Sequence, residues 1–246
     1  MIKALLFDLN GTLIDIHTDE WHDDVYRMMS NLLDYQGIYL SPSDLRKVFF
    51  DYMKRQLRHS DEKYPEFDVE AIFAKILHKY ATVRTKKLSE QKLTLLPNFL
   101  AEAYRAATRF RLELYPDVIK TLDTLKKEFI MGAVSDGQSP WVVPELKRVG
   151  LKKYFDFIIA SGDLGYRKPD PRLYRQALHK LNVRPEEVVF VGNDMYRDVW
   201  GAHQAGMKTV FFKSNQGDHR SHGVEADYII YHFAQLPEAL EFLDKE

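Results

Sequence analysis

The spacing of apolar residues divides the chain into two regions. From about Asp15 to Arg111, apolar residues recur at helical intervals and no run has the texture of a strand. Ser41 and Asp68 are suited to cap helix N-termini, and the polar stretch around Pro65 predicts a loop over residues 60–67. We therefore expect helices over residues 21–35, 42–59, 68–80 and 89–109, the last of them started, kinked or broken by Pro97.

The rest of the chain alternates between short apolar runs and helical segments. Ile2–Phe7 is such a run, and others follow Pro116 at residues 129–135, 155–160, 188–192, 208–212 and 227–230. Alternation of this kind is typical of a doubly wound parallel sheet. We therefore expect an α/β fold with a Rossmann-like core and an inserted all-helical cap over the carboxyl edge of the sheet. The core would comprise residues 1–15 and 112–246, and the cap residues 16–111.

Composition narrows the class of protein. The chain has 246 residues, of which 45% are hydrophobic, enough for one large domain or for a core with a smaller accessory domain. Its net charge of −1 gives no basic excess for nucleic acid or an anionic membrane. The lack of cysteine excludes disulfides, zinc thiolates and a thiol nucleophile. No apolar run approaches the ~20 residues of a membrane span, and no cleavage pattern follows the N-terminal run. A cytoplasmic location is therefore predicted.

Polar residues with catalytic potential stand where the predicted strands end. The first strand leads into Asp8, Asn10 and Thr12, and the second ends in Ser135-Asp136-Gly137. A later strand is followed by Asn193, Asp194 and Asp198, and Lys168 stands just before the helix that Asp170 caps. The carboxyl ends of parallel strands meet at one edge of the sheet, so these groups are expected to converge. A carboxylate nucleophile, a hydroxyl with turn amides, a lysine and further acids would suit phosphoryl transfer with a bound Mg²⁺.

Together these stretches resemble the four motifs of haloacid-dehalogenase-like hydrolases. The resemblance is carried by Asp8-Leu9-Asn10-Gly11-Thr12, Ser135-Asp136-Gly137, Lys168-Pro169-Asp170-Pro171, and Gly192 to Asp198 followed by Gly201-Ala202 and Ala205-Gly206-Met207. It implies a strand order near 3-2-1-4-5 and a helical cap between the first and second motifs. It further implies an aspartyl-phosphate on Asp8, a Mg²⁺ cofactor and a small phosphorylated substrate. The residues then predicted are catalytic Asp8, Asn10, Ser135, Lys168 and Asp198, substrate-binding Thr12, Asp136 and Gly137, and metal-binding Asp8, Asn10 and Asp194.

Two positions depart from the family pattern. Asn10 stands where the family has the aspartate that acts as general acid and base, and asparagine cannot exchange a proton near neutral pH. The backbone carbonyl of Asn10 remains able to bind Mg²⁺. Asn193 stands where the first aspartate of the fourth motif is usual. Either Asp194 takes that ligand position, or Asn193 contributes its amide oxygen to a weaker metal site.

Three functions follow from these departures. The first is a Mg²⁺-dependent phosphatase or phosphotransferase with altered acid–base chemistry, which the retained Asp194 and Asp198 favour. The second is a 2-haloacid dehalogenase, because halide leaves without a proton, although two acids beside Asp8 would repel a carboxylate substrate. The third is a protein that binds a phosphate ligand without turnover. The sequence leaves the physiological substrate and the oligomeric state, monomer or homodimer, open.

Overall fold

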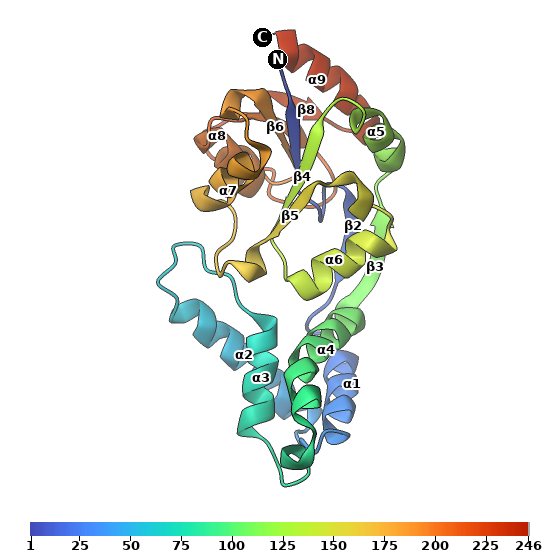
Figure 1. Cartoon of the computed structure of the whole chain (residues 1–246), viewed down its shortest axis with the longest axis vertical. Helices are drawn as coiled ribbons and strands as arrows, with labels where there is room; N and C mark the ends of the chain where they lie inside the picture. The colour runs from blue at the N-terminus through green and yellow to red at the C-terminus, as the bar shows by residue number, and fades with distance from the viewer. Residues whose placement is uncertain (246) are drawn as a thin grey trace.

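The computed structural model describes residues 1–245 and contains a parallel sheet and a separate group of helices (Figure 1). Within the described residues the sheet has six strands in the order β5-β4-β1-β6-β7-β8, and every neighbouring pair is parallel. Counted along the chain, this order is 3-2-1-4-5-6, which confirms the predicted α/β class and the order 3-2-1-4-5. The strands are β1 (Ala4–Phe7), β4 (Ile130–Ser135), β5 (Phe157–Ala160), β6 (Val188–Gly192), β7 (Lys208–Phe212) and β8 (Tyr228–Ile230).

The central strands are apolar throughout because helices cover both faces of the sheet. In β1, Leu5 and Phe7 pack in one hydrophobic cluster, whereas Ala4 and Leu6 pack in another on the opposite face. The first cluster also contains residues of α5 (Val118–Leu125), α6 (Ser139–Arg148) and α9 (Leu236–Lys245). The second contains residues of α7 (Pro171–Leu181) and α8 (Gly201–Gln204). The period-2 alternation of side chains thus places each strand in two cores at once.

The helical group has a hydrophobic core of its own. It comprises α1 (Asp23–Asp34), α2 (Pro42–Arg58), α3 (Val69–Lys79) and α4 (Glu90–Thr108), which bury residues between Val25 and Tyr104 against one another. The predicted caps are present, since the Ser41 and Asp68 side chains accept hydrogen bonds from Asp44 N and Ala71 N. The helix α4 is continuous through Pro97, which neither starts nor breaks it. The tertiary packing of α4 outweighs the loss of a single helical hydrogen bond at proline.

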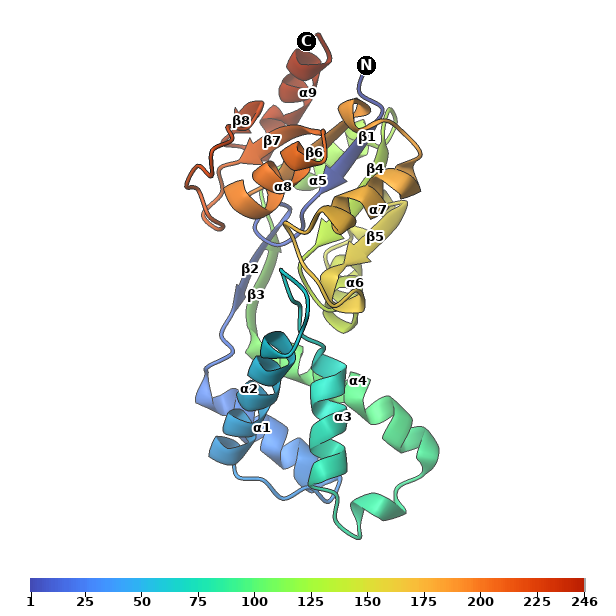
Figure 2. The ribbon, with the colours of Figure 1, turned by 90° about the vertical axis from the view of Figure 1, so that its left-hand side faces the viewer.

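The expectation that residues 15–111 contain no strand is wrong. Ile14–Thr18 forms β2 and Arg109–Leu114 forms β3, and the two pair as an antiparallel ribbon. This ribbon crosses both predicted boundaries of the helical region and connects it to the sheet (Figure 2). Most residues of the two strands are partly or fully exposed, and the strands are separated in sequence by the whole helical region. Local periodicity therefore carried no signal for it.

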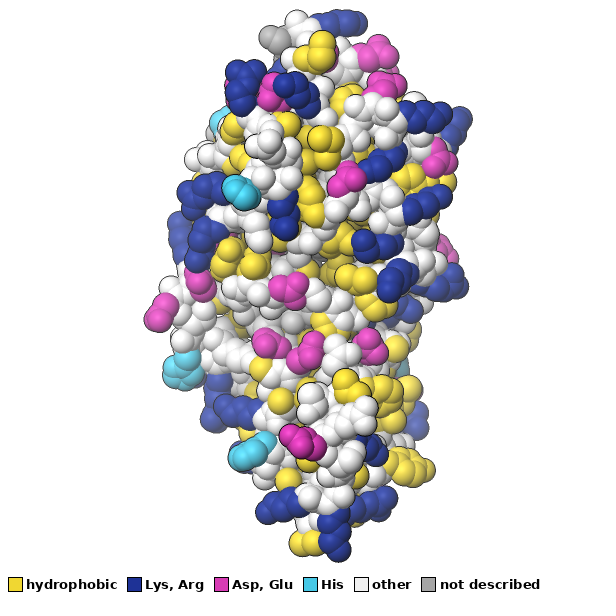
Figure 3. All heavy atoms as spheres, viewed as in Figure 1, with side chains coloured by type: hydrophobic (Ala, Val, Ile, Leu, Met, Phe, Trp, Pro, Cys, Tyr) yellow, Lys and Arg dark blue, Asp and Glu magenta, His cyan; other side chains and the backbone are white. Residues whose placement is uncertain are grey.

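No helix within residues 1–245 is long and apolar enough to cross a bilayer. Lys and Arg side chains lie among Asp and Glu side chains on the face seen in Figure 3.

Candidate active site

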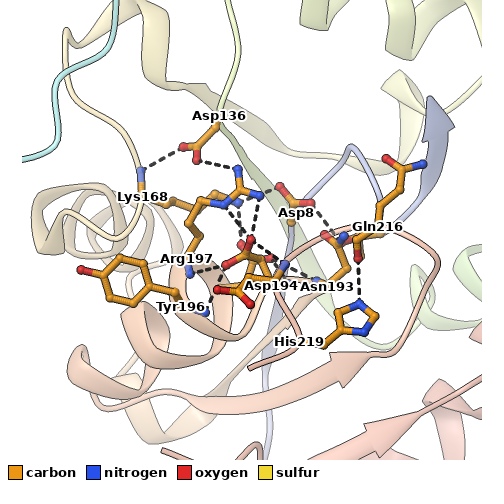
Figure 4. A network of polar contacts seen from close by, with 12 residues as sticks. Asp8, Asp136, Lys168, Asn193, Asp194, Tyr196, Arg197, Gln216 and His219 are labelled. Carbon is orange, nitrogen blue, oxygen red and sulfur yellow. Dashed lines mark hydrogen bonds and ion pairs between the residues drawn. The ribbon is translucent and has the colours of Figure 1, made fainter. Parts of the chain in front are cut away.

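A buried lysine joins two carboxylates at the carboxyl edge of the sheet. Lys168 Nζ lies 2.7 Å from Asp8 Oδ1 and 2.7 Å from Asp198 Oδ1. Asp8 directly follows β1, and Asp198 lies in the π-helical turn Met195–Trp200 that follows the neighbouring strand β6. All three residues are buried: Asp8 is 6% exposed, Lys168 3% and Asp198 1%. The fold therefore brings together three residues that are widely separated in the chain, and Figure 4 shows Asp8 and Lys168 within the surrounding polar network.

The protonation of this group follows from burial and charge. Burial by itself lowers the pKa of Lys168, but the carboxylates of Asp198 and Asp8 outweigh it and raise that pKa, so the ammonium stays charged. Burial raises the pKa of the Asp198 carboxyl to about 7, against the lowering effect of Lys168. Asp198 is further fixed by the backbone N–H groups of Asn193 and Asp194, which both donate to its Oδ2 at 3.0 Å.

Thr12 connects Asp8 to Asn193. Its hydroxyl lies 3.0 Å from Asp8 Oδ2 and 3.1 Å from Asn193 Oδ1. The close approach depends on Gly11, which has φ +88° and on which a Cβ would lie 2.3 Å from Asn193 Nδ2. The turn after β1 therefore requires glycine on two grounds, the left-handed backbone and the space that Asn193 occupies. Asn10, the position of the missing acid, is half-buried beside this turn.

Asp194 has a different environment from the one expected of a metal ligand. Its Oδ1 accepts from the backbone N–H of Tyr196 and Arg197, and its Oδ2 accepts from Asp218 N and from the Arg197 guanidinium. It thus caps the π-helical turn and forms an ion pair, and both of its oxygens are committed. Among residues 1–245, no group of three or more His, Cys, Asp or Glu side chains is arranged to hold a metal ion. The Thr12 hydroxyl instead connects Asp8 to the amide oxygen of Asn193.

The turn after β4 presents an unpaired hydroxyl. Ser135 is 1% exposed, and its Oγ has no hydrogen-bond partner within the described residues. Asp136 Oδ1 accepts from Lys168 N at 2.9 Å, while its Oδ2 lies 3.5 Å from both Arg167 Nε and Arg197 Nη1 without a hydrogen bond. The N–H of Gly137 is already used, since it donates to Ser161 Oγ at 3.0 Å. Within this turn, Ser135, predicted to be catalytic, has a hydroxyl donor that is unpaired among the described residues.

Some residues near the site were not assigned a role from the sequence. Arg197 lies between Asp194 and Asp136 as a partly exposed cation, and its spacing of three residues from Asp194 was the available signal. Glu66 belongs to the loop between α2 and α3 and accepts a hydrogen bond from Ser161 Oγ at 2.7 Å. The local sequence of that loop gives no sign of a role for Glu66, because Glu66 reaches the sheet edge only through the folding of the helical group.

Comparison with known proteins places this fold and site in a family. The family model for haloacid dehalogenase-like hydrolases matches residues 2–206, so the chain belongs to that family of hydrolases. The family resemblance inferred from the four motifs is thereby confirmed.

Relatives of the chain include enzymes of two kinds. The glyceraldehyde 3-phosphate phosphatase of Pyrococcus furiosus is 36% identical over 149 residues, a match that spans 58% of this chain and 60% of that protein. The protein of the same name in Methanopyrus kandleri is 30% identical over 85% of this chain and 83% of its own length. The (S)-2-haloacid dehalogenase 4A of Burkholderia cepacia is 31% identical over 85% of this chain and 82% of its length.

Solved structures give the same picture. A HAD phosphatase from Thermococcus onnurineus matches 97% of this chain and 98% of its own, with a TM-score of 0.63 at 28% identity. A 2-haloacid dehalogenase from Pseudomonas syringae matches 98% of this chain and 99% of its own, with a TM-score of 0.72 at 24% identity, and shows the shared fold. The choice between the two chemistries therefore depends on the site itself.

Proposed function

We propose that this protein is a Mg²⁺-dependent phosphatase that forms an aspartyl-phosphate on Asp8 and acts on a small phosphorylated metabolite. The observation that carries the proposal is the pairing of Asp8 with Lys168 at 2.7 Å beside the buried, unpartnered hydroxyl of Ser135. A carboxylate held against a cation, next to an unused donor, suits the attack on a phosphoryl group and the charge that develops there. The phosphatase names of several relatives support the same choice.

The reaction follows from these groups in two steps. A carboxylate oxygen of Asp8 forms a bond to phosphorus while the bond from phosphorus to the leaving oxygen breaks, and the leaving group departs with that electron pair. Lys168 and the Ser135 hydroxyl neutralise the equatorial phosphoryl oxygens. Water then attacks the phosphorus of the aspartyl-phosphate, which releases inorganic phosphate and restores the Asp8 carboxylate.

The residues present fit a hard divalent cation. A carboxylate oxygen of Asp8 and the amide oxygen of Asn193 both lie within hydrogen-bond distance of the Thr12 hydroxyl, and Asn10 follows Asp8 in the same turn. Oxygen donors of this kind suit Mg²⁺, which binds through one or two carboxylates together with substrate oxygens. When bound, the ion would offset the negative charge that a phosphate dianion brings to this carboxylate-rich edge. We propose Asp8, Asn10 and Asn193 as the ligand set, with Asp194 holding Arg197 instead.

Asn10 limits the choice of leaving group. Its amide supplies no proton, and Asp198 offers no replacement because Lys168 and two backbone N–H groups already occupy its oxygens. General acid–base catalysis contributes roughly 10²–10⁴-fold, and an alkyl phosphate suffers most from its loss. We therefore propose that acyl or aryl phosphates, which leave without protonation, are turned over faster than alkyl phosphates.

The helical region, residues 16–111, is proposed as a cap that selects the substrate. The basis is its position at the carboxyl edge of the sheet and the contacts of its α2–α3 loop with residues near the site. A substrate bound at Asp8 would lie between this loop and the sheet edge, so its leaving group would face the helical region.

A dehalogenase activity is the second candidate, because Asn10 is compatible with halide departure and because relatives include a dehalogenase. The carboxylate of Asp198, which shares Lys168 with Asp8, disfavours the carboxylate substrate of that reaction unless a cation offsets it.

Turnover assays separate the two candidates. The phosphatase predicts Mg²⁺-dependent release of phosphate from p-nitrophenyl phosphate, abolished by EDTA and by Asp8→Asn. The dehalogenase predicts chloride release from 2-chloropropionate that survives EDTA. An absence of phosphate release at high enzyme and Mg²⁺ concentration would refute the proposal.

A further inference from the structure

The loop between α2 and α3 connects the helical region to the sheet edge. Glu66 N donates to Gly165 O and Arg167 N donates to Tyr64 O, each at 2.9 Å, and Pro65 pairs with Tyr166 as an isolated antiparallel bridge. These backbone hydrogen bonds seat the loop on the segment that leads from β5 to Lys168. We call residues 60–68 the docking loop.

One side chain of the docking loop, Glu66, is connected by hydrogen bonds to the turn that follows β4. Glu66 Oε2 accepts from Ser161 Oγ at 2.7 Å, and Ser161 Oγ in turn accepts from Gly137 N at 3.0 Å. The Ser161 hydroxyl has a single hydrogen, and the Gly137 carbonyl, at 3.5 Å, is a poorer acceptor for it than the carboxylate. The direction of the chain is therefore fixed: Gly137 donates to Ser161, which donates to Glu66.

This series of hydrogen bonds ends at Gly137, which belongs to the same turn as Ser135. Gly137 is held on its other side as well, because its carbonyl accepts from Gly162 N at 2.9 Å. Gly137 lies two residues after Ser135 in the turn that follows β4, so a shift of this turn would displace the free hydroxyl. Ser161 is fully buried, which makes its two hydrogen bonds costly to leave unmade.

The surroundings of the Glu66 carboxyl affect its pKa and fix its orientation. Burial raises its pKa, while Arg167 and the Ser161 hydroxyl act in the opposite direction. A carboxylate withdrawn from water is costly unless its oxygens accept hydrogen bonds. Ser161 Oγ donates to Oε2, and Phe67 N donates to Oε1 at 3.1 Å. Glu66 is thus fixed in orientation from both of its oxygens.

We propose that Glu66 is a positioning residue, which holds the Ser135–Gly137 turn in its phosphoryl-binding geometry through Ser161 when the docking loop is seated. The inference rests on the proposed phosphatase function and adds to it a physical connection between the helical region and the reacting group. Seating of the loop then completes the site rather than only covering it.

Four variants test the connection, assayed with p-nitrophenyl phosphate and Mg²⁺. Glu66→Ala and Ser161→Ala should each lower kcat by about 10- to 100-fold, the scale of a small misplacement of a reacting group, with a smaller change in KM. Glu66→Gln keeps an oxygen acceptor for Ser161 and should remain within about 3-fold of the parent enzyme. Glu62→Ala is the matched control, because it removes an ion pair between the docking loop and Arg172 without touching the Ser161 chain.

The double variant distinguishes positioning from simple anchoring. Glu66→Ala with Ser161→Ala should fall no further than about 3-fold below the worse single variant, because both remove the same chain. The proposal would be overturned if the loss in kcat of the double variant equalled the product of the two single losses. It would also be overturned if Glu62→Ala were as impaired as Glu66→Ala.

Amide exchange provides a readout that needs no turnover. Hydrogen exchange at Gly137 should accelerate in Glu66→Ala and Ser161→Ala but not in Glu66→Gln or Glu62→Ala. Unchanged exchange at Gly137 in Glu66→Ala would overturn the positioning role even if activity fell. An inactive parent enzyme whose Gly137 exchange nevertheless responds to Glu66→Ala would contradict the proposed function and leave the structural connection intact.

Discussion

Replacement of Lys168 by methionine tests the electrostatics of the site. The change keeps most of the volume and removes the one ammonium that pairs with both Asp8 and Asp198 at 2.7 Å. Breaking a buried pair by deleting one partner costs about 3–5 kcal/mol, because an uncompensated charge stays buried. Here two carboxylates lose their cation, although Thr12 and two backbone N–H groups still donate to them. We expect a loss of about 3–5 kcal/mol in the free energy of unfolding at pH 8.

The loss should shrink as the pH falls. Lys168 is a group that lowers the pKa of Asp198, which burial already raises to about 7, so its removal raises that pKa further. A carboxyl with a raised folded-state pKa is destabilising when it is charged, and the penalty shrinks steadily as the pH falls below that pKa toward the ordinary value of 3.8. The variant should therefore lie closer to the parent protein at pH 5 than at pH 8.

Urea unfolding at both pH values measures this directly. In thermal unfolding, the same loss at pH 8 corresponds to a Tm lower by roughly 6–20 °C for a chain of this size. Adding Asp8→Asn and Asp198→Asn to Lys168→Met should restore much of the stability, because the whole charged set is then gone. The electrostatic reasoning is refuted if the single variant stays within about 1 kcal/mol of the parent at pH 8, or if its deficit is the same at pH 5.

Three further changes have defined outcomes. Asn10→Asp should raise kcat for an alkyl phosphate by roughly 10²–10⁴-fold and for p-nitrophenyl phosphate far less; equal effects on both substrates would exclude a proton-transfer role. Gly11→Ala should lower stability by about 1–3 kcal/mol more than Gly150→Ala in urea unfolding, because both have positive φ but only Gly11 meets a neighbour, and equal losses would contradict this. Although burial opposes it, Arg197 lowers the pKa of Asp194, so stability from this pair is lost as the pH falls below the ordinary value of 3.8. Unfolding of Asp194→Asn should lack that acid dependence, and an unaltered dependence would count against the pair.

The core of the fold could be predicted because each buried strand is an apolar run with a polar residue at its end. Ala4–Phe7 and Val188–Gly192 are buried at every position, which period and composition reveal without knowledge of the partner strand. Asp8 could be identified as a candidate for the same reason, whereas Lys168 lies beyond the end of β5 and was identified from the Lys168-Pro169-Asp170-Pro171 motif. Their pairing at 2.7 Å depends on the path of the segment between β5 and α7.

Features that depend on side-chain direction or distant pairing could not be predicted. The sequence offered Asn193 and Asp194 as adjacent candidates for one ligand position, and the choice between them depends on how the backbone turns after β6. After that turn, the Arg197 guanidinium donates to Asp194 Oδ2, which is the basis for proposing Asn193 as the ligand. The β2–β3 ribbon was missed because Ile14–Thr18 pairs with residues on the far side of the whole helical region. Glu66 reaches Ser161 only once α2 and α3 have packed.

The ribbon also makes the helical region a replaceable unit. Thr18 and Arg109 are paired across β2 and β3, so the chain leaves the sheet side and returns to it at neighbouring points. A short turn that joins these two residues would close the ribbon as an ordinary hairpin without moving β1 or β4. Exchange of the entire insertion at this pair, by gene duplication or by grafting, would change what reaches Asp8 while Lys168 and Asp198 stay paired, provided that the new insertion replaces the contact of Glu66 with Ser161. The same two-stranded stalk gives protein engineers a single cut site for transplanting specificity among relatives.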